Sequence, residues 1–485
     1  MASSRLLTVL STFLLVSSGA AFNCSAPPVF IDIHSRIVHG TPIFQYGSFI
    51  GVGSPGQNQS LVPSLRQNET SFAAVTFCDS SNLADCAQST HGNFNPRDSS
   101  TWIEDSAYRS TDLNSVATKV VSGRDNIHLY THFFETDPAW EHLVTDTPIS
   151  IALNGSRNPG VVGLGLSSTL LRSLFDDGVI AARTFGLYIG SGMKRANGLV
   201  NGSIVFGGYD SGRFTGPVHS YPINTQYQDP FTVGVTDIII DNPRGERNVS
   251  LYDPRRFPTN KPAAPFTARL STDEYTISMP SSLTQNFASL LSAVPSDLYD
   301  DGSLALSPGA NGTTMTFVLS DGYRVTIPSE VMYNVSGISP VAARDANSTA
   351  PFTLGQSFLS QVYLAADYDN YIFHLADVVA KNNYVMPVTF CPKTTPKAYI
   401  RPSSNVFRKE GMVGAVVGGV FGSIGLVVGL VVLTIMLRRK IRARQAKKAA
   451  EQITARSEQK VQAFQQLDIE SQSSHSGKDD RWRKI

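Results

Sequence analysis

Side chains capable of acid–base or metal chemistry are few in this sequence, and most lack the spacing that catalysis requires. The nine histidines and four cysteines form no Cys/His cluster with zinc-ligand spacing. No Gly-X-Ser-X-Gly motif supports a Ser-His-Asp hydrolase. We therefore predict no metal and no cofactor.

The elements that would position any reactive side chain are predicted to be short β-strands. Between residues 28 and 390, apolar runs alternate with clusters of Gly, Pro, Asn, Asp and Ser. The runs Ser203–Phe206, Val235–Ile240 and Met315–Leu319 are each followed by such turn residues. Two short helices are predicted over Ser168–Asp176 and Ser281–Ser292. This pattern is typical of a mainly β protein, either a sandwich or a barrel.

Six segments between residues 40 and 380 resemble, in order and spacing, motifs of the pepsin-like aspartic proteases, the peptidase A1 family. They are the hairpin Ile50–Gln57, the Cys78–Cys86 loop, Phe94–Trp102, Gly160–Gly165, Phe206–Asp210, and Thr353–Leu359 with Asp367–Asn370 shortly after it. The chain is most similar to fungal, membrane-anchored members of that family.

The resemblance implies a bilobal, pepsin-like acid protease fold with a substrate cleft between two β-rich lobes. We expect an N-terminal lobe at 28–225 and a C-terminal lobe at 226–390. In this family each lobe carries one catalytic aspartate in a loop, and a glycine-centred segment threads across that loop. Val161-Val162-Gly163 and Thr353-Leu354-Gly355 stand at the two threading positions. Glycine suits such a close approach of two backbones.

Serine stands at both positions where the resemblance places a catalytic aspartate. Ser64 comes eleven residues after the hairpin residue Gly53, and Ser271 comes nine residues before the proline that opens a helix. Arg66 and Asp273 replace the glycines that the family has two residues after each aspartate. A serine hydroxyl does not ionise near a working pH and cannot share a proton as a carboxylate does. We therefore predict no catalytic residue.

Other acidic groups do not restore the pair. Asp273 stands at a glycine position, so we expect its side chain to point in a different direction from a catalytic aspartate. Asp210-Ser211-Gly212 has the composition of a catalytic triplet, but its context resembles a non-catalytic turn of the family. Asp146-Thr147-Pro148 lacks the glycine. Tyr108 is either the tyrosine of the family's flap or an ordinary strand residue.

Two apolar segments predict a protein of the secretory pathway that crosses the membrane once. Residues 1–21 combine Arg5, an apolar run and small residues, as a signal peptide does, although an uncleaved anchor is the alternative. Gly411–Leu437 has no charged residue over 27 positions, which is long enough to span a bilayer. A polar stalk at 391–410 precedes it.

The tail at 438–485 sets the predicted orientation. It carries 13 Lys and Arg against 6 Asp and Glu, a net charge of +7, whereas the whole chain has +1. Basic residues beside a span stay on the cytoplasmic side. We expect a type I protein of the plasma membrane with its N-terminus outside and the lipid bilayer as a partner.

Cysteines and glycosylation sequons all precede the predicted span. Cys78 and Cys86 form the easiest disulfide, which leaves Cys24 for Cys391, although four cysteines allow three pairings. Nine Asn-X-Ser/Thr sequons predict surface glycans. They begin at Asn23, Asn58, Asn68, Asn154, Asn201, Asn248, Asn311, Asn334 and Asn347.

Three functions fit these features. We expect a catalytically inactive cell-surface glycoprotein that binds an extended peptide or a cell-wall glycan. The alternatives are an active membrane-anchored aspartic endopeptidase whose aspartates are misaligned, and a structural or sensor glycoprotein. Gly414, Gly418 and Gly422 at four-residue spacing, and likewise Gly425 and Gly429, favour a homodimer through the span, although spans are often Gly-rich. No compact basic face with aromatics indicates nucleic-acid binding.

Overall fold

The protein is described by a computed structural model that divides the chain into two compact units, Met1–Tyr399 and Ile400–Ile485. The residues that the structure describes are 22, 24–107, 112, 117–131, 141–193, 195, 198, 200–226, 229–242, 247–258, 263–380, 385–400, 428–445, 447–448, 451–452 and 454–462. The predicted signal peptide and Tyr108 lie outside this set.

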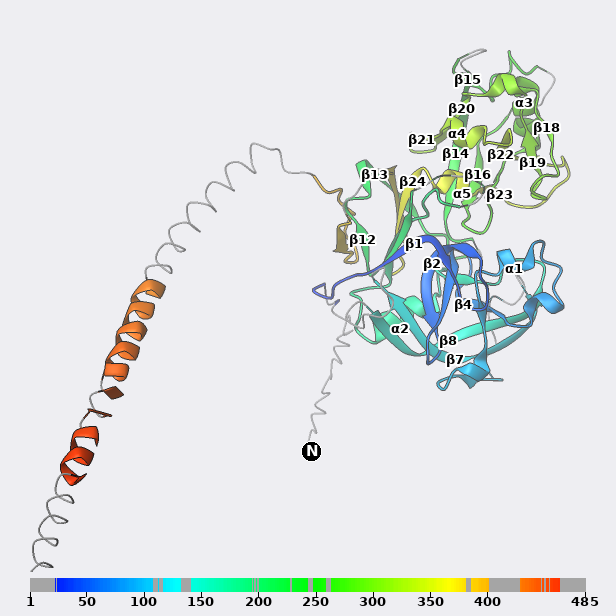
Figure 1. Ribbon diagram of the computed structural model, residues 1–485. Helices are drawn as coiled ribbons and strands as arrows, with labels where there is room; N and C mark the ends of the chain where they lie inside the picture. The colour runs from blue at the N-terminus through cyan, green and yellow to red at the C-terminus, as the bar shows by residue number, and fades with distance from the viewer. Residues whose placement is uncertain are drawn as a thin grey trace, which may run out of the picture. The chain divides into compact units, whose positions relative to one another are not determined.

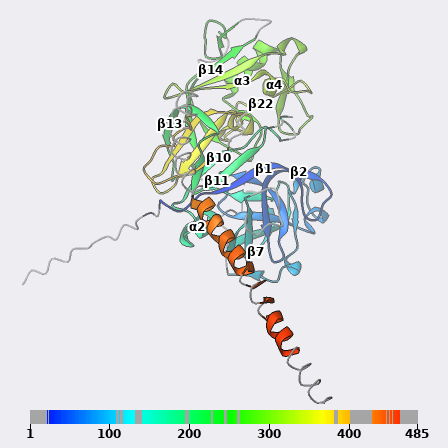
Figure 2. The ribbon, with the colours of Figure 1, turned by 60° about the vertical axis from the view of Figure 1, so that its left-hand side comes forward.

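Within the described residues, a sheet of 14 strands forms the framework of the first unit (Figures 1 and 2). Its strands are β1 (Val29–Ile37), β2 (Phe44–Val52), β3 (Gln57–Ser64), β4 (Thr70–Ala74), β5 (Asn93–Phe94), β6 (Ile103–Glu104), β7 (Ala117–Tyr130), β8 (Glu141–Gly155), β9 (Val161–Gly163), β10 (Thr184–Tyr188), β11 (Gly202–Phe206), β13 (Phe214–Pro222), β24 (Val362–Asp367) and β25 (Ile372–Val378). In β1, Val29, Ile31 and Ile33 are buried while the residues between them are half-buried, which is the alternation of a strand with one face in the core.

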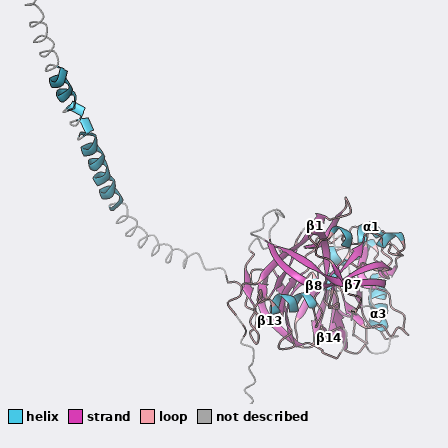
Figure 3. Cartoon of the chain, turned by 90° about the horizontal axis from the view of Figure 1, so that it is seen from below, coloured by secondary structure: helices cyan, strands magenta, loops and turns pink. Residues whose placement is uncertain are grey.

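A second sheet of ten described strands builds the other lobe. Its strands are β14 (Thr232–Asp241), β15 (Val249–Ser250), β16 (Phe266–Leu270), β17 (Ile277–Ser278), β18 (Val294–Pro295), β19 (Ser303–Ala305), β20 (Thr314–Leu319), β21 (Arg324–Ile327), β22 (Ile338–Ala342) and β23 (Phe352–Leu354). A small pair, β12 (Gly208–Asp210) and β26 (Pro387–Thr389), completes the strands. The mainly β, bilobal fold is therefore confirmed (Figure 3).

The first sheet also takes strands from the end of this unit. β24 pairs with β10, and β25 pairs with both β24 and β13. The chain thus returns to the first sheet after it has formed the second one. Residue 226 therefore does not separate all strands of the first sheet from all strands of the second.

Among the described residues of the first unit, the helices are short and lie between strands. They are α1 (Cys86–Ser89), α2 (Thr169–Asp176), α3 (Ser281–Leu291), α4 (Ser329–Met332) and α5 (Gln356–Leu359), with single 3-10 turns at Phe77–Asp79, Pro96–Asp98 and Pro308–Ala310. α2 and α3 fall where the sequence predicts helices. At the start of α2, the Ser168 hydroxyl accepts a hydrogen bond from the Leu171 amide at 3.2 Å, which caps the helix.

Both predicted threading segments pass close beneath a neighbouring loop. β9 runs parallel to β3, with Gly163 opposite Ser64, and β23 runs parallel to β16. A Cβ added at Gly163 would lie 2.6 Å from the Glu69 backbone, and one added at Gly355 would lie 2.3 Å from the Thr276 carbonyl oxygen. Only glycine permits these approaches.

Two disulfides, Cys78–Cys86 and Cys24–Cys391, confirm the predicted pairing. Among the sequon asparagines within the described residues, Asn201, Asn248, Asn311 and Asn347 are exposed. Asn334 is buried, and its amide donates to the Tyr299 hydroxyl at 3.2 Å. Asn58, Asn68 and Asn154 are half-buried, and Asn23 lies outside the described residues. The exposed four are the sequons best placed to carry a glycan.

In the second unit, residues 428–445 are helical and exposed. They contain the last part of the predicted span, whereas 411–427, with four of the five glycines in the predicted dimer face, lie outside the described residues. No helix among the residues that the structure describes has the length and apolarity needed to cross a bilayer.

We predict that Gly355→Ala destabilises the first unit by about 3 kcal/mol or more, because its methyl group would collide with backbone that cannot move independently. Chemical unfolding measures the loss. Gly309→Ala is the matched control, since the nearest heavy atom to its added Cβ is 3.8 Å away. Equal stability of the two variants would contradict the threading role of Gly355.

Candidate functional site

Two loops meet where the threaded strands end. We call Ser64–Arg66, at the end of β3, and Ser271–Asp273, after β16, the two central loops. The Leu164 amide donates to the Ser64 carbonyl oxygen at 2.8 Å, and the Ser271 amide donates to the Leu354 carbonyl oxygen at 3.0 Å. Each central loop is thus bound to the segment that threads past it, as the resemblance implies.

A hydrogen bond from a backbone amide to a side-chain hydroxyl joins the central loops. The Leu65 amide donates to the Thr272 hydroxyl oxygen at 3.1 Å, and both residues are buried. Leu65 and Thr272 are the middle residues of the two loops. Because Leu65 has no hydroxyl group, it cannot accept an equivalent hydrogen bond from the Thr272 amide.

The predicted site serines occupy this meeting point. Ser64 is fully buried, and its hydroxyl oxygen accepts from the Gln67 amide at 3.2 Å. Ser271 is also buried, and its hydroxyl oxygen accepts from the Asp273 amide at 3.3 Å. The two side chains are therefore fixed by backbone amides within their own loops.

Asp273, which stands at a glycine position of the family, lies at the meeting point of the two central loops. Its carboxyl group is hydrogen-bonded to the Ser64 side chain across the two loops. Asp273 is exposed at the surface of the first unit. Desolvation and the charge of Glu274 raise the pKa of Asp273, while the Ser64 hydrogen bond and the charges of Arg66 and Arg269 oppose that rise. The centre therefore contains one carboxyl group beside two hydroxyls.

Charged side chains surround this carboxyl group. Arg269 contacts Asp229 at 3.1 Å and Glu274 at 2.6 Å. Arg66 lies 3.8 Å from the other Asp229 oxygen. Asp229 thus contacts Arg66 of the first central loop and Arg269, which precedes the second. These ion pairs link the two loops and surround Asp273 with charge.

The other sequence candidates are structural. Asp210 is buried in β12, where its carboxylate accepts from the Gly212 amide at 3.1 Å and the Met386 amide at 2.8 Å. Burial raises the pKa of Asp210, and Arg213 lies 3.9 Å away. Asp146 is exposed and pairs with Arg124 at 3.1 Å.

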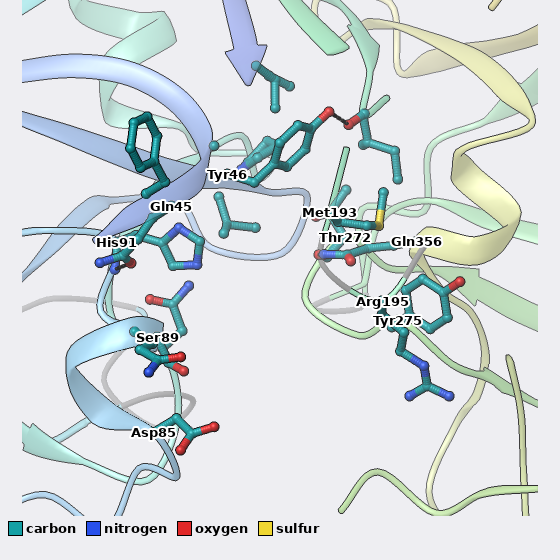
Figure 4. Close-up of a pocket in the computed structure, with 18 of the residues that line it drawn as sticks. Gln45, Tyr46, Asp85, Ser89, His91, Met193, Arg195, Thr272, Tyr275 and Gln356 are labelled. Carbon is teal, nitrogen blue, oxygen red and sulfur yellow. Dashed lines mark hydrogen bonds between the residues drawn. The ribbon is translucent and has the colours of Figure 1, made fainter. Parts of the chain in front are cut away.

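A pocket of about 400 Å³ opens beside the central loops (Figure 4). Gln45, Asp85, Ser89 and His91 form one wall, and Met193, Arg195, Thr272, Tyr275 and Gln356 form the facing wall. Val62 and Pro63, which lead into Ser64, also line it. The pocket therefore adjoins the Ser64–Asp273 contact.

Sequence reasoning did not identify these pocket residues, because they come from segments far apart in the chain. Two of them, Asp85 and His91, adopt a positive φ, of 48° and 60°. Within the described part of the chain, no group of three His, Cys, Asp or Glu side chains is placed to hold a metal ion.

Comparisons with known proteins agree with this architecture. A family model described as "Eukaryotic aspartyl protease" matches residues 45–378, more than half of the chain. Rhizopuspepsin-4 of Rhizopus niveus is 25% identical over 378 residues, covering 76% of this chain and 79% of that protein. The probable aspartic-type endopeptidase opsB of Aspergillus fumigatus is 21% identical over 387 residues, covering 72% of each. Gastricsin of Cavia porcellus is 24% identical over 203 residues, covering 40% of this chain and 48% of that protein.

We predict that Thr272→Val lowers the free energy of unfolding by about 1–3 kcal/mol, because the buried Leu65 amide loses its acceptor. Chemical unfolding monitored by fluorescence measures the change. The control is Thr326→Val on the exposed face of β21, which should change stability by less than about 0.5 kcal/mol. Similar losses in both variants would show that the contact between the loops does not matter.

Proposed function

The chain belongs to the family of eukaryotic aspartyl proteases, and from that membership we propose that it is a non-catalytic member whose cleft binds a ligand at the cell surface. The observation that carries this proposal is the pair of serines, Ser64 and Ser271, at the ends of the two threaded strands. These are the positions that the resemblance assigns to the catalytic aspartates.

Aspartic proteolysis requires two carboxyl groups that hold one proton between them. One accepts a proton from water while the other donates one to the peptide carbonyl. Ser64 and Ser271 can donate and accept hydrogen bonds, but their hydroxyls do not ionise at a working pH. Loss of a general base alone typically costs about 10²–10⁴-fold in rate. A centre with only Asp273 lacks one member of the pair.

An active endopeptidase remains the second candidate because Asp273 reaches Ser64. The Aspergillus fumigatus relative, a probable aspartic-type endopeptidase, supports the same interpretation. Against it, a single carboxyl group cannot be base and acid at the same moment. The neighbouring Arg66 and Arg269 also stabilise its charged form.

The ligand of the cleft would be an extended peptide or a cell-wall glycan. Clefts between β-rich lobes can hold an extended chain through backbone hydrogen bonds, with pockets for alternate side chains. The 400 Å³ pocket supplies such a subsite beside the central loops. A structural or sensor glycoprotein is the further alternative, in which the pocket has no ligand.

We place this cleft outside the cell on a type I, single-pass protein. Two disulfides are expected of a chain that matures in an oxidising compartment. The predicted signal peptide, the uncharged segment 411–437 and the basic tail give the orientation. The spaced glycines of the segment would support a homodimer.

We predict that the full-length chain, purified in detergent, shows no inhibitor-sensitive peptide cleavage at acid pH. Fluorogenic peptide libraries provide the assay, with rhizopuspepsin as the positive control. Cleavage that an aspartic-protease inhibitor blocks, and that Asp273→Asn abolishes, would instead establish the endopeptidase. In Asp273→Asn the amide can still hydrogen-bond to Ser64. A loss of activity in this variant would therefore reflect the loss of the carboxyl group and not only of the contact with Ser64.

We predict that protease added outside intact cells removes the first unit and leaves the basic tail protected. Epitope tags at the C-terminus and in the exposed loop near Asp345 report the two ends. Peptide-N-glycosidase should lower the mass of the external fragment only. A C-terminal tag that is accessible from outside would contradict the proposed orientation.

A further inference from the structure

A turn of the second sheet contacts the edge of the first sheet, at residues that do not line the pocket. β13 is an edge strand of the first sheet, and the chain passes from it to β14 of the second sheet. Residues 320–323, which connect β20 to β21, lie against β13 and its neighbour β25. We call this contact the clasp. It joins the two lobes where the chain crosses from one to the other.

Hydrogen bonds between side chains form the clasp. His219 Nδ1 lies 2.7 Å from one carboxylate oxygen of Asp321, and the Tyr221 hydroxyl donates to the other oxygen at 3.0 Å. The Tyr323 hydroxyl donates to Asp377 at 3.0 Å. The Tyr323 amide also donates to Asp321 at 3.1 Å, which fixes the carboxylate within its own turn. All of these bonds except the last cross from one sheet to the other.

His219 can gain a proton without leaving the clasp. A carboxylate only accepts, so Nδ1 carries a proton in both the neutral and the charged imidazole. The His219 side chain is 21% exposed, and no hydrogen bond to its Nε2 is found within the described part of the chain. Solvent protons can therefore reach Nε2. Protonation there converts the hydrogen bond to Asp321 into an ion pair with the same geometry.

The Tyr323 ring provides a second contact that depends on the charge of His219. The two rings are stacked, with their centres 4.2 Å apart and an interplanar angle of 15°. A cation over the face of an aromatic ring is attracted by the negative charge of that face. Protonation of His219 therefore strengthens its contacts with Asp321 and with Tyr323 at the same time.

The other titratable groups of the clasp are held in the state that this pairing needs. Partial burial opposes the charge of Asp321, but the hydrogen bonds just described outweigh it and lower the pKa of that carboxyl group. Asp321 therefore stabilises the clasp above the usual range for aspartate, and this contribution is lost only as pH falls through the lowered pKa. Burial and the neighbouring carboxylates raise the pKa of Tyr221 and Tyr323, so both hydroxyls remain donors.

Two other basic side chains lie near the clasp. His374 of β25 has its Nδ1 2.8 Å from the Ser220 hydroxyl, and enclosure by protein lowers the pKa of its imidazole. Arg324, the first residue of β21, is exposed. Among the residues that the structure describes, only His219 forms an ion pair with Asp321. The charge that faces this carboxylate therefore depends on one histidine.

We propose that this contact is a pH-sensitive clasp, in which protonated His219 holds the turn of the second sheet against β13 and deprotonated His219 lets the two lobes move. Histidine is the side chain whose charge changes between about pH 5 and 8. The clasp would thus respond to differences in pH along the secretory route that we propose for the chain. The inference goes beyond the proposed binding role and does not depend on it, since no ligand takes part.

Distances between the lobes test the clasp directly. Nitroxide labels on Arg172→Cys in α2 and on Ala346→Cys after β22 stand at exposed positions. The four native cysteines are all in disulfides, so only the introduced thiols react. Pulsed EPR on the full-length chain in detergent measures the distance distribution at about pH 5.5 and about pH 8. We expect the distribution to be at least about 1.5 times as wide at the higher pH, because more orientations of the lobes become populated.

Variants of the two paired residues assign the pH dependence. His219→Phe keeps a flat ring against Tyr323 but cannot take a proton, so it should show the wide distribution at both pH values. Asp321→Asn removes the charge that faces the imidazole and should behave in the same way. It also provides the test if His219→Phe does not fold. His142→Phe is the matched control, since His142 is an exposed histidine of β8 outside the clasp, and it should keep the pH dependence.

Each other outcome contradicts the clasp. Equal widths at the two pH values in the labelled parent chain overturn it, as does a distribution that widens at the lower pH. A pH dependence that survives His219→Phe and Asp321→Asn belongs to another group. Loss of the pH dependence in His142→Phe would also remove His219 from its role. These outcomes leave the proposed binding role unaffected, because peptide cleavage and ligand binding are measured separately.

Discussion

The passage of a glycine-centred segment beneath each central loop is the constraint on which the rest of this structure depends. Gly163 and Gly355 face backbone atoms at distances that no side chain could occupy. Because both loops are threaded in this way, they can approach each other closely enough for the Leu65 amide to reach Thr272. That one hydrogen bond spans 207 residues of sequence. It fixes where Ser64 lies, and therefore which groups can surround it.

What surrounds Ser64 is a polar centre with one carboxyl group, Asp273, instead of two. Arg269, Asp229 and Glu274 form ion pairs beside it, with Arg66 close to Asp229. Such partly buried networks stabilise a fixed arrangement only when each charge has a partner. The scaffold of the family is thus retained, with serines where the resemblance expects the two aspartates. In the function that we propose, the adjoining pocket would hold a ligand beside this centre.

Much of the fold could be predicted from the sequence because its signals are local. Turn residues after apolar runs indicate strands, a serine before an apolar periodic run starts α2, and glycines mark the threading segments. The site was less predictable. The direction of Asp273 depends on a loop that lies across the cleft, and the pocket joins Gln45 and His91 to Tyr275 and Gln356. Side chains brought together by long-range packing leave no periodic pattern in a single sequence.

The central claim is that Asp273 is the one carboxyl group hydrogen-bonded to Ser64 and that no second carboxyl group shares its proton. The most direct measurement is a pH titration of the Asp273 carboxyl carbon by NMR, with aspartate labelled selectively and Asp273→Asn used for assignment. We predict one transition, at a pKa above the usual range for aspartate, because desolvation outweighs the contacts that stabilise its charge. Two coupled transitions at Asp273, the signature of a second carboxyl group sharing its proton, would contradict the claim.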